Sequence, residues 1–350
     1  MPVQQRFCFK DPAGEDIYLF TLTNQSGTTV TITNYGAIIS SFTIRKKDGS
    51  TNDIVLGFDD PAQYLDEDYL AQYPWFGCAV GRYANRIKNG EFELDGKKYP
   101  LTKNRGEEQL HGGWDGFGKR TWRLVNRDET PCSFLELRYL SREGEEGFPG
   151  NLETIIRFEL SEENELSYEY KATTDQPTPV NLTHHSYFNL NNGEGTIDEH
   201  EIRIHADEML EQEENLTATG NILPVAGTPF DFREFRQISE GLTLVDEYDK
   251  SFVVNKNDSQ LVSEARSAAS GLYLQIYSTE PIVHFYSGKW IPGIKGKMGT
   301  VYGPFFGFCL ETHTHPNAVN FPHFPNTILR PGETYYQKTV YKVIPTLLSP

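Results

Sequence analysis

Basic residues are scarce in this sequence. Its 350 residues carry 49 acidic against 32 basic side chains, which gives a formal net charge of -17 at pH 7. Such a surface repels phosphate backbones and anionic lipids, and it offers few of the Lys and Arg side chains that release counterions when nucleic acid binds. We therefore expect neither nucleic acid nor a membrane as a partner.

Clustered cysteines and long hydrophobic runs are also missing. Four cysteines are scattered along the chain without the CxxC spacing or the dense framework of a small secreted domain, so we expect free thiols at Cys8, Cys78, Cys132 and Cys309. No run approaches the ~20 apolar residues that span a bilayer, and the first residues lack the basic and then apolar pattern of a secretion signal. We expect a soluble, cytoplasmic protein.

The sequence is instead rich in short segments of alternating apolar and polar residues. Examples are "TVTIT" at 29–33, "GEFELDGKKYPL" at 90–101 and "TIIRFELSEENELSYEYKA" at 154–172. The first predicts a single strand, and the other two predict hairpins with one wet face and a polar turn.

Helices are expected only briefly, around 61–69 and 231–238. Because no helix of crossover length separates the strands, the pattern favours an all-β fold, a large antiparallel β-sandwich, over a parallel α/β fold. No linker or low-complexity tract divides the chain, so we predict one domain over residues 1–350, although two sandwiches that share an interface would give the same pattern.

Two adjacent histidines stand in the segment "PVNLTHHSYFNL" at 179–190. Successive side chains of a strand point to opposite faces, so only one of the two rings can reach a given site. The even-numbered positions are mostly apolar and include His184, for which we predict a structural hydrogen bond. The odd-numbered positions are polar or amphipathic, and place His185 toward a hydrogen-bonding pocket.

Three further side chains are candidates, each with a plain structural alternative. His111 precedes two glycines, which allow close backbone approach to a ligand or simply form a turn. Glu311 ends a hydrophobic strand in phase with Cys309, and could equally be an edge residue in a salt bridge. Arg86 could bind hydroxyl groups or pair with one of the many carboxylates.

A metal site is the main rival use of the histidines. His313 and His315 share a strand face with Glu311, but Pro316 follows at once, and no second pair has clear ligand spacing. The sequence also lacks GxSxG, Walker-type and helix-opening GxGxxG motifs. We therefore expect no metal and no organic cofactor.

Seven ordered segments together resemble the aldose 1-epimerase (galactose mutarotase) family. They are "GRYANRI", "LHGGWDGFGKRTW", "NLTHHSYFNL", "TPFDFR", "YDKSF", "FYSG" and "CLET". The resemblance implies a galactose mutarotase-like β-supersandwich that interconverts the α and β anomers of free aldoses such as galactose and glucose. We expect a monomer or a weak homodimer with a monosaccharide substrate.

The resemblance also assigns roles to residues. It implies Glu311 as general base, His185 as general acid, and His111 as a histidine assisting at the ring end of the sugar. The substrate-binding set that it implies is Asn85, Arg86, His111, Tyr187, Asp249 and His284. His284 stands where the family commonly has Gln, and His184 where it often has Asn; "ETHTH" also departs from the usual continuation. These differences bear on which sugar hydroxyls are preferred.

Three other functions compete with epimerisation. A sugar-binding protein without activity would keep Arg86 and His111 but would tolerate loss of Glu311. A glycoside hydrolase could use Asp249 and Glu311 as paired carboxylates. An enzyme for hexose 6-phosphates would need more Arg or Lys around the pocket than the sequence suggests.

Overall fold

The computed structural model describes residues 2–46, 48–128, 132–255 and 258–345. Its largest element is a nine-stranded sheet in which every neighbouring pair is antiparallel. Across this sheet the strands are β11 (Arg123–Asp128), β12 (Ser133–Ser141), β13 (Leu152–Leu160), β14 (Glu165–Thr174), β29 (Tyr335–Pro345), β23 (Leu272–Ser278), β22 (Leu261–Ser267), β17 (Glu201–Ile204) and β20 (Arg236–Gln237).

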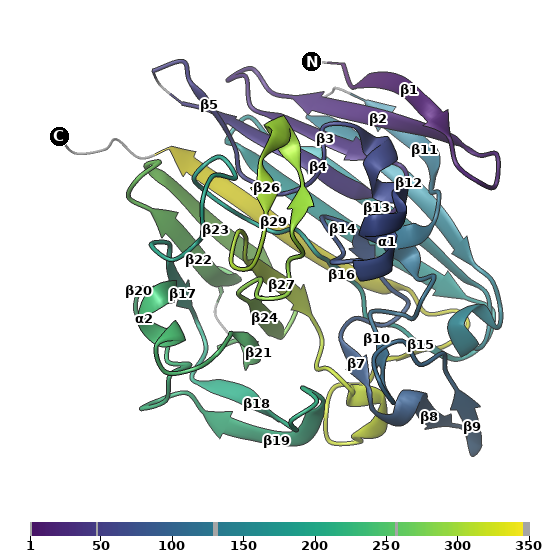
Figure 1. Cartoon of the computed structure of the whole chain (residues 1–350). Coiled ribbons are helices and arrows are strands. Elements are labelled where there is room, and N and C mark those ends of the chain that lie inside the picture. Colours follow the sequence, from purple (N-terminus) through teal and green to yellow (C-terminus); the bar gives the residue numbers. More distant parts are fainter. Residues whose placement is uncertain (1, 47, 129–131, 256–257, 346–350) are drawn as a thin grey trace.

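Two five-stranded antiparallel sheets accompany it (Figure 1). The N-terminal sheet runs β1 (Gln4–Lys10), β2 (Asp16–Thr23), β3 (Thr29–Thr33), β4 (Ile38–Arg45) and β5 (Thr51–Asp53). The other, here called the site sheet, runs β19 (Ala218–Pro224), β18 (Glu208–Gln212), β21 (Asp249–Val253), β24 (Ile282–Tyr286) and β27 (Cys309–His313).

The remaining elements are short. The described helices are α1 (Glu67–Gln72) and α2 (Ile238–Leu242), with 3-10 turns at Pro61–Leu65, Lys88–Gly90, Phe117–Lys119, Glu145–Gly147, Lys297–Gly299 and Ala318–Asn320. The two-stranded pairs are β6 (Ala79–Val80) with β16 (Thr183–His184), β7 (Arg86–Ile87) with β10 (Gln109–Leu110), β8 (Glu91–Leu94) with β9 (Lys97–Pro100), β15 (Thr178–Pro179) with β28 (Ile328–Leu329), and β25 (Ile294–Lys295) with β26 (Val301–Tyr302).

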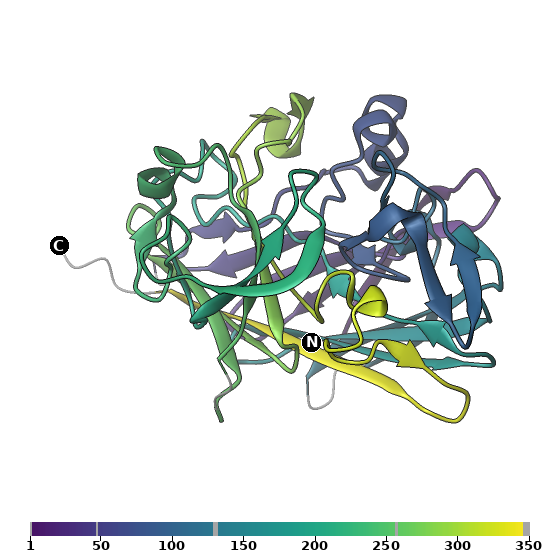
Figure 2. The same ribbon diagram turned by 90° about the horizontal axis from the view of Figure 1, so that it is seen from below.

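The main core lies between the nine-stranded sheet and the two smaller sheets. It joins Phe42 of the N-terminal sheet and Phe285 of the site sheet to Tyr168 of the large sheet in one hydrophobic cluster. Figure 2 shows β29 (yellow) in the lower layer and the N-terminal strands (purple) above it. The antiparallel sandwich expected from the sequence is therefore confirmed. The cluster extends from Val3 to Val343; the single domain stays a prediction, with which this continuity is consistent.

The strongest sequence patterns are confirmed as elements. Residues 29–33 form β3, 91–100 form the β8–β9 hairpin, and 152–174 form the β13–β14 hairpin, in which Leu160 pairs with Leu166. Alternate side chains of β13 are buried, as a strand with one wet face requires. Residues 61–65 and 67–72 are helical, close to the expected range.

Two predictions need correction. Residues 231–237 are not helical, because the Asp231 carboxylate accepts the backbone N–H of Arg233 at 3.4 Å and also binds its guanidinium, a local bonding pattern that competes with helix. Helix α2 starts only at Ile238. Residues 179–190 form no continuous strand; β15 and β16 are two residues each, and Phe188 makes only isolated bridges to Val55 and Phe308.

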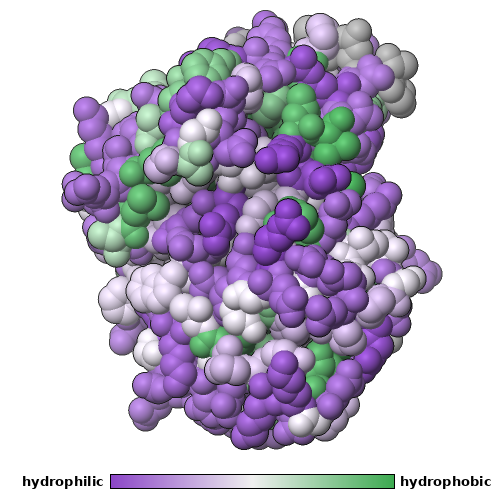
Figure 3. Space-filling view, turned by 90° about the vertical axis from the view of Figure 1, so that its right-hand side faces the viewer, coloured by the Kyte–Doolittle hydropathy of each residue, from purple (hydrophilic) through white to green (hydrophobic). Residues whose placement is uncertain are grey.

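The face drawn in Figure 3 agrees with the hydrophilic composition of the chain. Figure 3 shows a face dominated by hydrophilic residues, with the hydrophobic ones in scattered patches. Within the described residues, neither helix has the length and apolar character needed to cross a membrane.

Candidate active site

Three strands of the site sheet present a row of polar side chains to one side. In the register, Ser251 of β21 pairs with His284 of β24, and His284 pairs with Glu311 of β27. Directly paired residues of antiparallel strands point to the same face, so these three side chains stand side by side. The next row on that face contains Asp249, Tyr286 and Cys309. The alternation of β27 thus places Glu311 and Cys309 on one face, as the sequence predicted.

His185 lies opposite this face, immediately after β16. Its backbone is fixed on both sides, because its N–H donates to Cys78 O and its C=O accepts from Gly77 N, both at 2.9 Å. Its Nε2 lies 3.6 Å from Glu311 Oε1, and its Nδ1 lies 3.5 Å from the Cys309 sulfur. His184 points the other way, into the core, where its ring packs near Tyr168 and bonds Ala37 O and Ser186 Oγ. The expected opposition of the two rings is therefore present.

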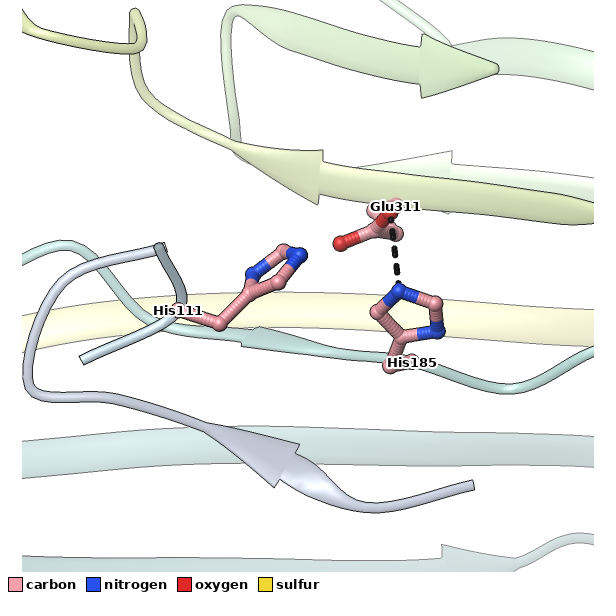
Figure 4. Close-up of side chains that lie close together, drawn as sticks. All are labelled: His111, His185 and Glu311. Carbon is pink, nitrogen blue, oxygen red and sulfur yellow. Dashed lines mark ion pairs between the residues drawn. The ribbon is translucent and has the colours of Figure 1, made fainter. Parts of the chain in front are cut away.

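His111 reaches the same place from the turn after β10. It adopts a left-handed conformation with φ 53°, and the following Gly112 has φ 82°. A Cβ at Gly112 would lie 2.0 Å from Gly81 O, so only glycine allows this close approach of the two loops. Figure 4 shows the rings of His111 and His185 converging on the Glu311 carboxylate.

The proton of the His111 ring can be placed from its neighbour. The backbone N–H of Asn85 donates to His111 Nδ1 at 3.3 Å. A ring nitrogen that accepts a hydrogen bond carries no proton, so the neutral ring is protonated on Nε2. His111 therefore offers an N–H donor to the site.

These side chains line one pocket. Its lining includes every residue of the expected site: Asn85, Arg86, His111, His185, Tyr187, Asp249, His284 and Glu311. It also includes Gln72, Tyr73, Pro74, Trp75, Arg105, Leu110, Tyr286 and Trp290. Thus the structure brings together residues that are spread over more than two hundred positions of the chain.

The acid and base candidates lie in a strongly desolvated environment. Burial, together with the negative charge of Asp249, raises the pKa of Glu311 well above its usual range, although Arg86 opposes this. Burial also lowers the pKa of His185 to about 3 and that of His111 well below its ordinary value. Each shift disfavours the charged form, so the carboxylate becomes a stronger base and the imidazolium a stronger acid.

The pKa of Asp249 shifts in the opposite direction to that of Glu311, because the neighbours of Asp249 outweigh its burial. Burial acts to raise its pKa, but the neighbouring His284 imidazole, together with Arg86, lowers it to about 2. His284 Nε2 lies 2.9 Å from Asp249 Oδ1. The pocket therefore holds one carboxylate that stays ionised and one that is poised to take up a proton.

Other polar residues of the segments "GRYANRI" and "PVNLTHHSYFNL" have structural contacts instead. Arg82 is buried and bonds Ser141 Oγ and the carbonyls of Pro149 and Gly150. Of the odd-numbered residues in 179–190, Asn181 and Asn189 bond backbone atoms, so the polar face serves the pocket only at His185 and Tyr187.

Some aromatic and basic residues of the pocket lining give no signal in the sequence. Trp75, Arg105 and Trp290 lie on loops without a recognisable spacing. Tyr286 could have been found, because it alternates in phase with His284 on the same strand.

Metal binding is the remaining use of this cluster. His111, His185 and Glu311 could each offer a ligand atom, all within 4.8 Å of one another. However, a ring that binds metal through Nε2 must be protonated on Nδ1, and the Asn85 N–H opposes that state in His111. The rival set with His313 and His315 also fits poorly, since His315 lies beyond the end of β27 and packs on Phe324.

Comparisons with known proteins show the family to which the chain is similar. A family model described as aldose 1-epimerase matches residues 18–342. The galactose mutarotase of Sus scrofa is 41% identical over 317 residues, which cover 89% of each chain. The aldose 1-epimerase of Escherichia coli (strain K12) is 36% identical over 343 residues, which cover 95% of this chain and 97% of that one.

Solved structures extend the likeness to the fold. A GalM/aldose epimerase homologue from C. elegans superposes with a TM-score of 0.87 and 32% identity, covering 98% of this chain and 100% of that one. A galactose 1-epimerase from Lactobacillus acidophilus NCFM gives 0.85 at 24% identity, covering 99% and 100%, and shares the fold. The galactose mutarotase-like architecture is thus confirmed, and the chain belongs to the aldose 1-epimerase family.

Proposed function

We propose that this protein interconverts the α and β anomers of free aldoses such as galactose and glucose, with Glu311 as general base and His185 as general acid. The observation that carries the proposal is the contact of these two groups at one pocket, 3.6 Å apart and both almost fully buried. Opening a pyranose requires one proton to leave the anomeric hydroxyl and another to reach the ring oxygen. An acid facing a base across the hemiacetal meets that need.

The pKa shifts suit the proposed proton transfers. Glu311 removes the proton of the anomeric hydroxyl while His185 Nε2 protonates the ring oxygen, so the C1–O5 bond breaks and an aldehyde forms. After rotation about C1–C2, the C5 hydroxyl attacks the other face of the aldehyde and both protons return. In ring opening a proton thus passes, by way of the sugar, from the His185 imidazolium to the Glu311 carboxylate, and reclosure returns it. The raised pKa of Glu311 and the lowered pKa of His185 favour the first of these transfers.

The other pocket residues would hold the part of the sugar that does not move. Arg86 Nε and Glu311 Oε2 are buried without a hydrogen-bond partner among the described residues, and such groups are costly unless a ligand satisfies them. A polyhydroxylated ring supplies both donors and acceptors. Arg86, Asp249, His284 and the Nε2–H of His111 would bind hydroxyls, with Tyr187 beside the His185 ring.

A sugar-binding protein without activity is the alternative from a different class. It would need the hydroxyl-binding groups but not an acid and a base in contact, so the Glu311–His185 pair favours the enzyme. A second arginine in the pocket lining, Arg105, makes a phosphorylated hexose worth including as a test substrate.

Polarimetry tests the proposal. Freshly dissolved α-D-galactose and α-D-glucose should approach their equilibrium rotation faster with the protein than in dilute buffer alone. In D₂O the sugar recovered should carry no deuterium on carbon, because ring opening breaks no C–H bond. Binding of galactose without any acceleration would favour the sugar-binding alternative, and deuterium at C2 would indicate an enediol isomerase.

We also propose the cytoplasm as the location, supported by four cysteines that are all free, as in a reducing compartment. The monomer or weak homodimer expected from the sequence stays a prediction.

A further inference from the structure

We propose that Asn85 and Ser251 are positioning residues that keep the proton of His284 on Nε2. His284 and Asp249 would then present a fixed N–H donor beside a carboxylate acceptor to one hydroxyl of the sugar. The inference deepens the proposed function, since the use of this donor and acceptor rests on a sugar substrate. The position of the proton itself does not depend on any reaction.

The orientation of the Asn85 amide is fixed by the backbone of the next residue. Its Oδ1 accepts the backbone N–H of Arg86 at 2.8 Å, and a backbone N–H can only donate. The other end of the amide must therefore be the NH₂ group. That nitrogen lies 3.5 Å from His284 Nδ1, at the long end of a hydrogen bond.

Ser251 supplies the second contact to the same ring nitrogen. Its Oγ lies 2.8 Å from His284 Nδ1, and the serine is buried in the row that runs from β21 to β27. An amide N–H can only donate, whereas a hydroxyl can do either. Because the Asn85 amide can only donate, His284 Nδ1 is the acceptor and carries no proton. The Ser251 hydroxyl then donates to the same nitrogen.

The proton of the neutral ring is then on Nε2, the nitrogen 2.9 Å from Asp249 Oδ1. The opposite tautomer would place an N–H against the Asn85 NH₂ and a lone pair against a carboxylate. Although the two atoms are close, Asp249 Oδ1 has no well-directed hydrogen bond from the described residues, and both side chains line the pocket. A sugar hydroxyl can therefore accept from the N–H and donate to the carboxylate.

The same asparagine also holds the second imidazole of the pocket. Its backbone N–H donates to His111 Nδ1, while its side chain faces His284 Nδ1. One residue, in a left-handed conformation with φ 60°, thus directs the Nε2–H groups of two histidines. This arrangement matters most at His284, because an imidazole cannot supply the donor and the acceptor that a carboxamide would.

Nitrogen-15 NMR of histidine-labelled protein without sugar tests the inference, with His284→Gln identifying the His284 signals. The wild type should show an unprotonated Nδ1 and a protonated Nε2. Asn85→Asp replaces the amide donor by an acceptor of the same shape, and should move the proton to Nδ1 or protonate both nitrogens. Ser251→Ala should allow a mixture of tautomers. Ser287→Ala, which alters a buried serine bonded to the Tyr248 backbone, is the matched control and should leave the signals unchanged.

Kinetics with galactose provide the second readout. Ser251→Ala should raise KM by about tenfold, the effect of one weakened hydrogen bond to substrate, with a smaller change in kcat. A wild-type His284 protonated on Nδ1, or an Asn85→Asp variant with the wild-type tautomer, would overturn the inference. If the tautomer is as expected but no mutarotation occurs, the proposed function fails and the proton placement stands.

Discussion

Adjacent residues can have opposite roles, as His184 and His185 show. His184 packs in the core and bonds Ala37 O and Ser186 Oγ, whereas His185 faces Glu311 in the pocket. Burial lowers the pKa of both rings, to about 4 and about 3. The pKa alone therefore does not distinguish the structural ring from the chemical one; the direction of the side chain does.

This difference predicts opposite effects of substitution. His185→Asn should lower kcat by ~10²–10⁴, the usual contribution of a well-placed acid, with little change in the free energy of unfolding. His184→Ala should retain most of the activity per folded molecule but lose ~2–4 kcal/mol of stability, because it leaves a cavity and two unpaired polar groups. Urea unfolding and polarimetry of both variants measure the two effects. A stable but inactive His184→Ala variant would contradict the assignment.

At the scale of elements, regular strands were predictable and the loops of the site were not. The alternation in 154–172 and the Asp-Gly turn at 95–96 gave the correct hairpins, because a period of two and a turn residue are local properties. Alternation within their own segments also predicted which way the side chains of His185 and Glu311 point. By contrast, Trp75, Arg105 and Trp290 reach the pocket through loops whose course depends on distant contacts.

The misplaced helix at 231–238 has a local cause that propensity does not reveal. There the Asp231 carboxylate competes for a backbone N–H, and Arg236 and Gln237 pair with β17. Resemblance to the family, rather than spacing, brought Asp249 into the expected site and gave His111 its role there. Their convergence depends on the packing of separate sheets, which a single sequence does not display.

The close approach of Gly112 to Gly81 holds the loop that carries His111. Gly112→Ala should both destabilise the protein and reduce activity, because its Cβ would lie 2.0 Å from Gly81 O and would displace the loop. Gly106→Ala is a matched control: its φ of 61° is also positive, but nothing lies within 4 Å of the added Cβ. Gly106→Ala should lower the free energy of unfolding by only ~1 kcal/mol, because it strains the backbone without a steric clash. Equal effects of the two variants on activity would show that His111 is not held by this contact.

The whole molecule should be sensitive to acid because several histidines are buried. Burial lowers the pKa of His184, His200 and His315 to about 4, and that of His185 and His313 to about 3. An unperturbed histidine has a pKa of ~6.5. Below that pH, the unfolded chain therefore binds protons that the folded protein does not. The free energy of unfolding should therefore be greatest above pH ~6.5 and fall steadily toward pH ~4.

One histidine outside the pocket provides the test. His200 Nε2 accepts the backbone N–H of Leu190 at 3.0 Å, a contact that a Gln side chain could reproduce. His200→Gln should flatten the fall of stability by up to ~1.4 kcal/mol per pH unit, the effect of one proton. Urea unfolding from pH 7.5 to 4.5 measures this slope, with His323→Gln, at an exposed position, as control. An unchanged slope in His200→Gln would contradict the acid sensitivity derived from burial.

We expect a single buried carboxylate, Glu311, to act as the base that opens the sugar ring. Glu311→Gln keeps the shape of the side chain and removes the basic oxygen. Glu264→Gln is a matched control, since Glu264 is equally buried but lies on β22, paired with Arg203 and His205 outside the pocket.

The most direct measurement is the rate at which α-D-galactose approaches its equilibrium optical rotation with wild-type protein and with each of these two variants, at low buffer concentration. We expect the wild type and Glu264→Gln to accelerate mutarotation, and Glu311→Gln, folded as judged by its circular dichroism, to be slower by ~10²–10⁴. A Glu311→Gln variant as fast as the wild type would contradict the role of Glu311 as the general base.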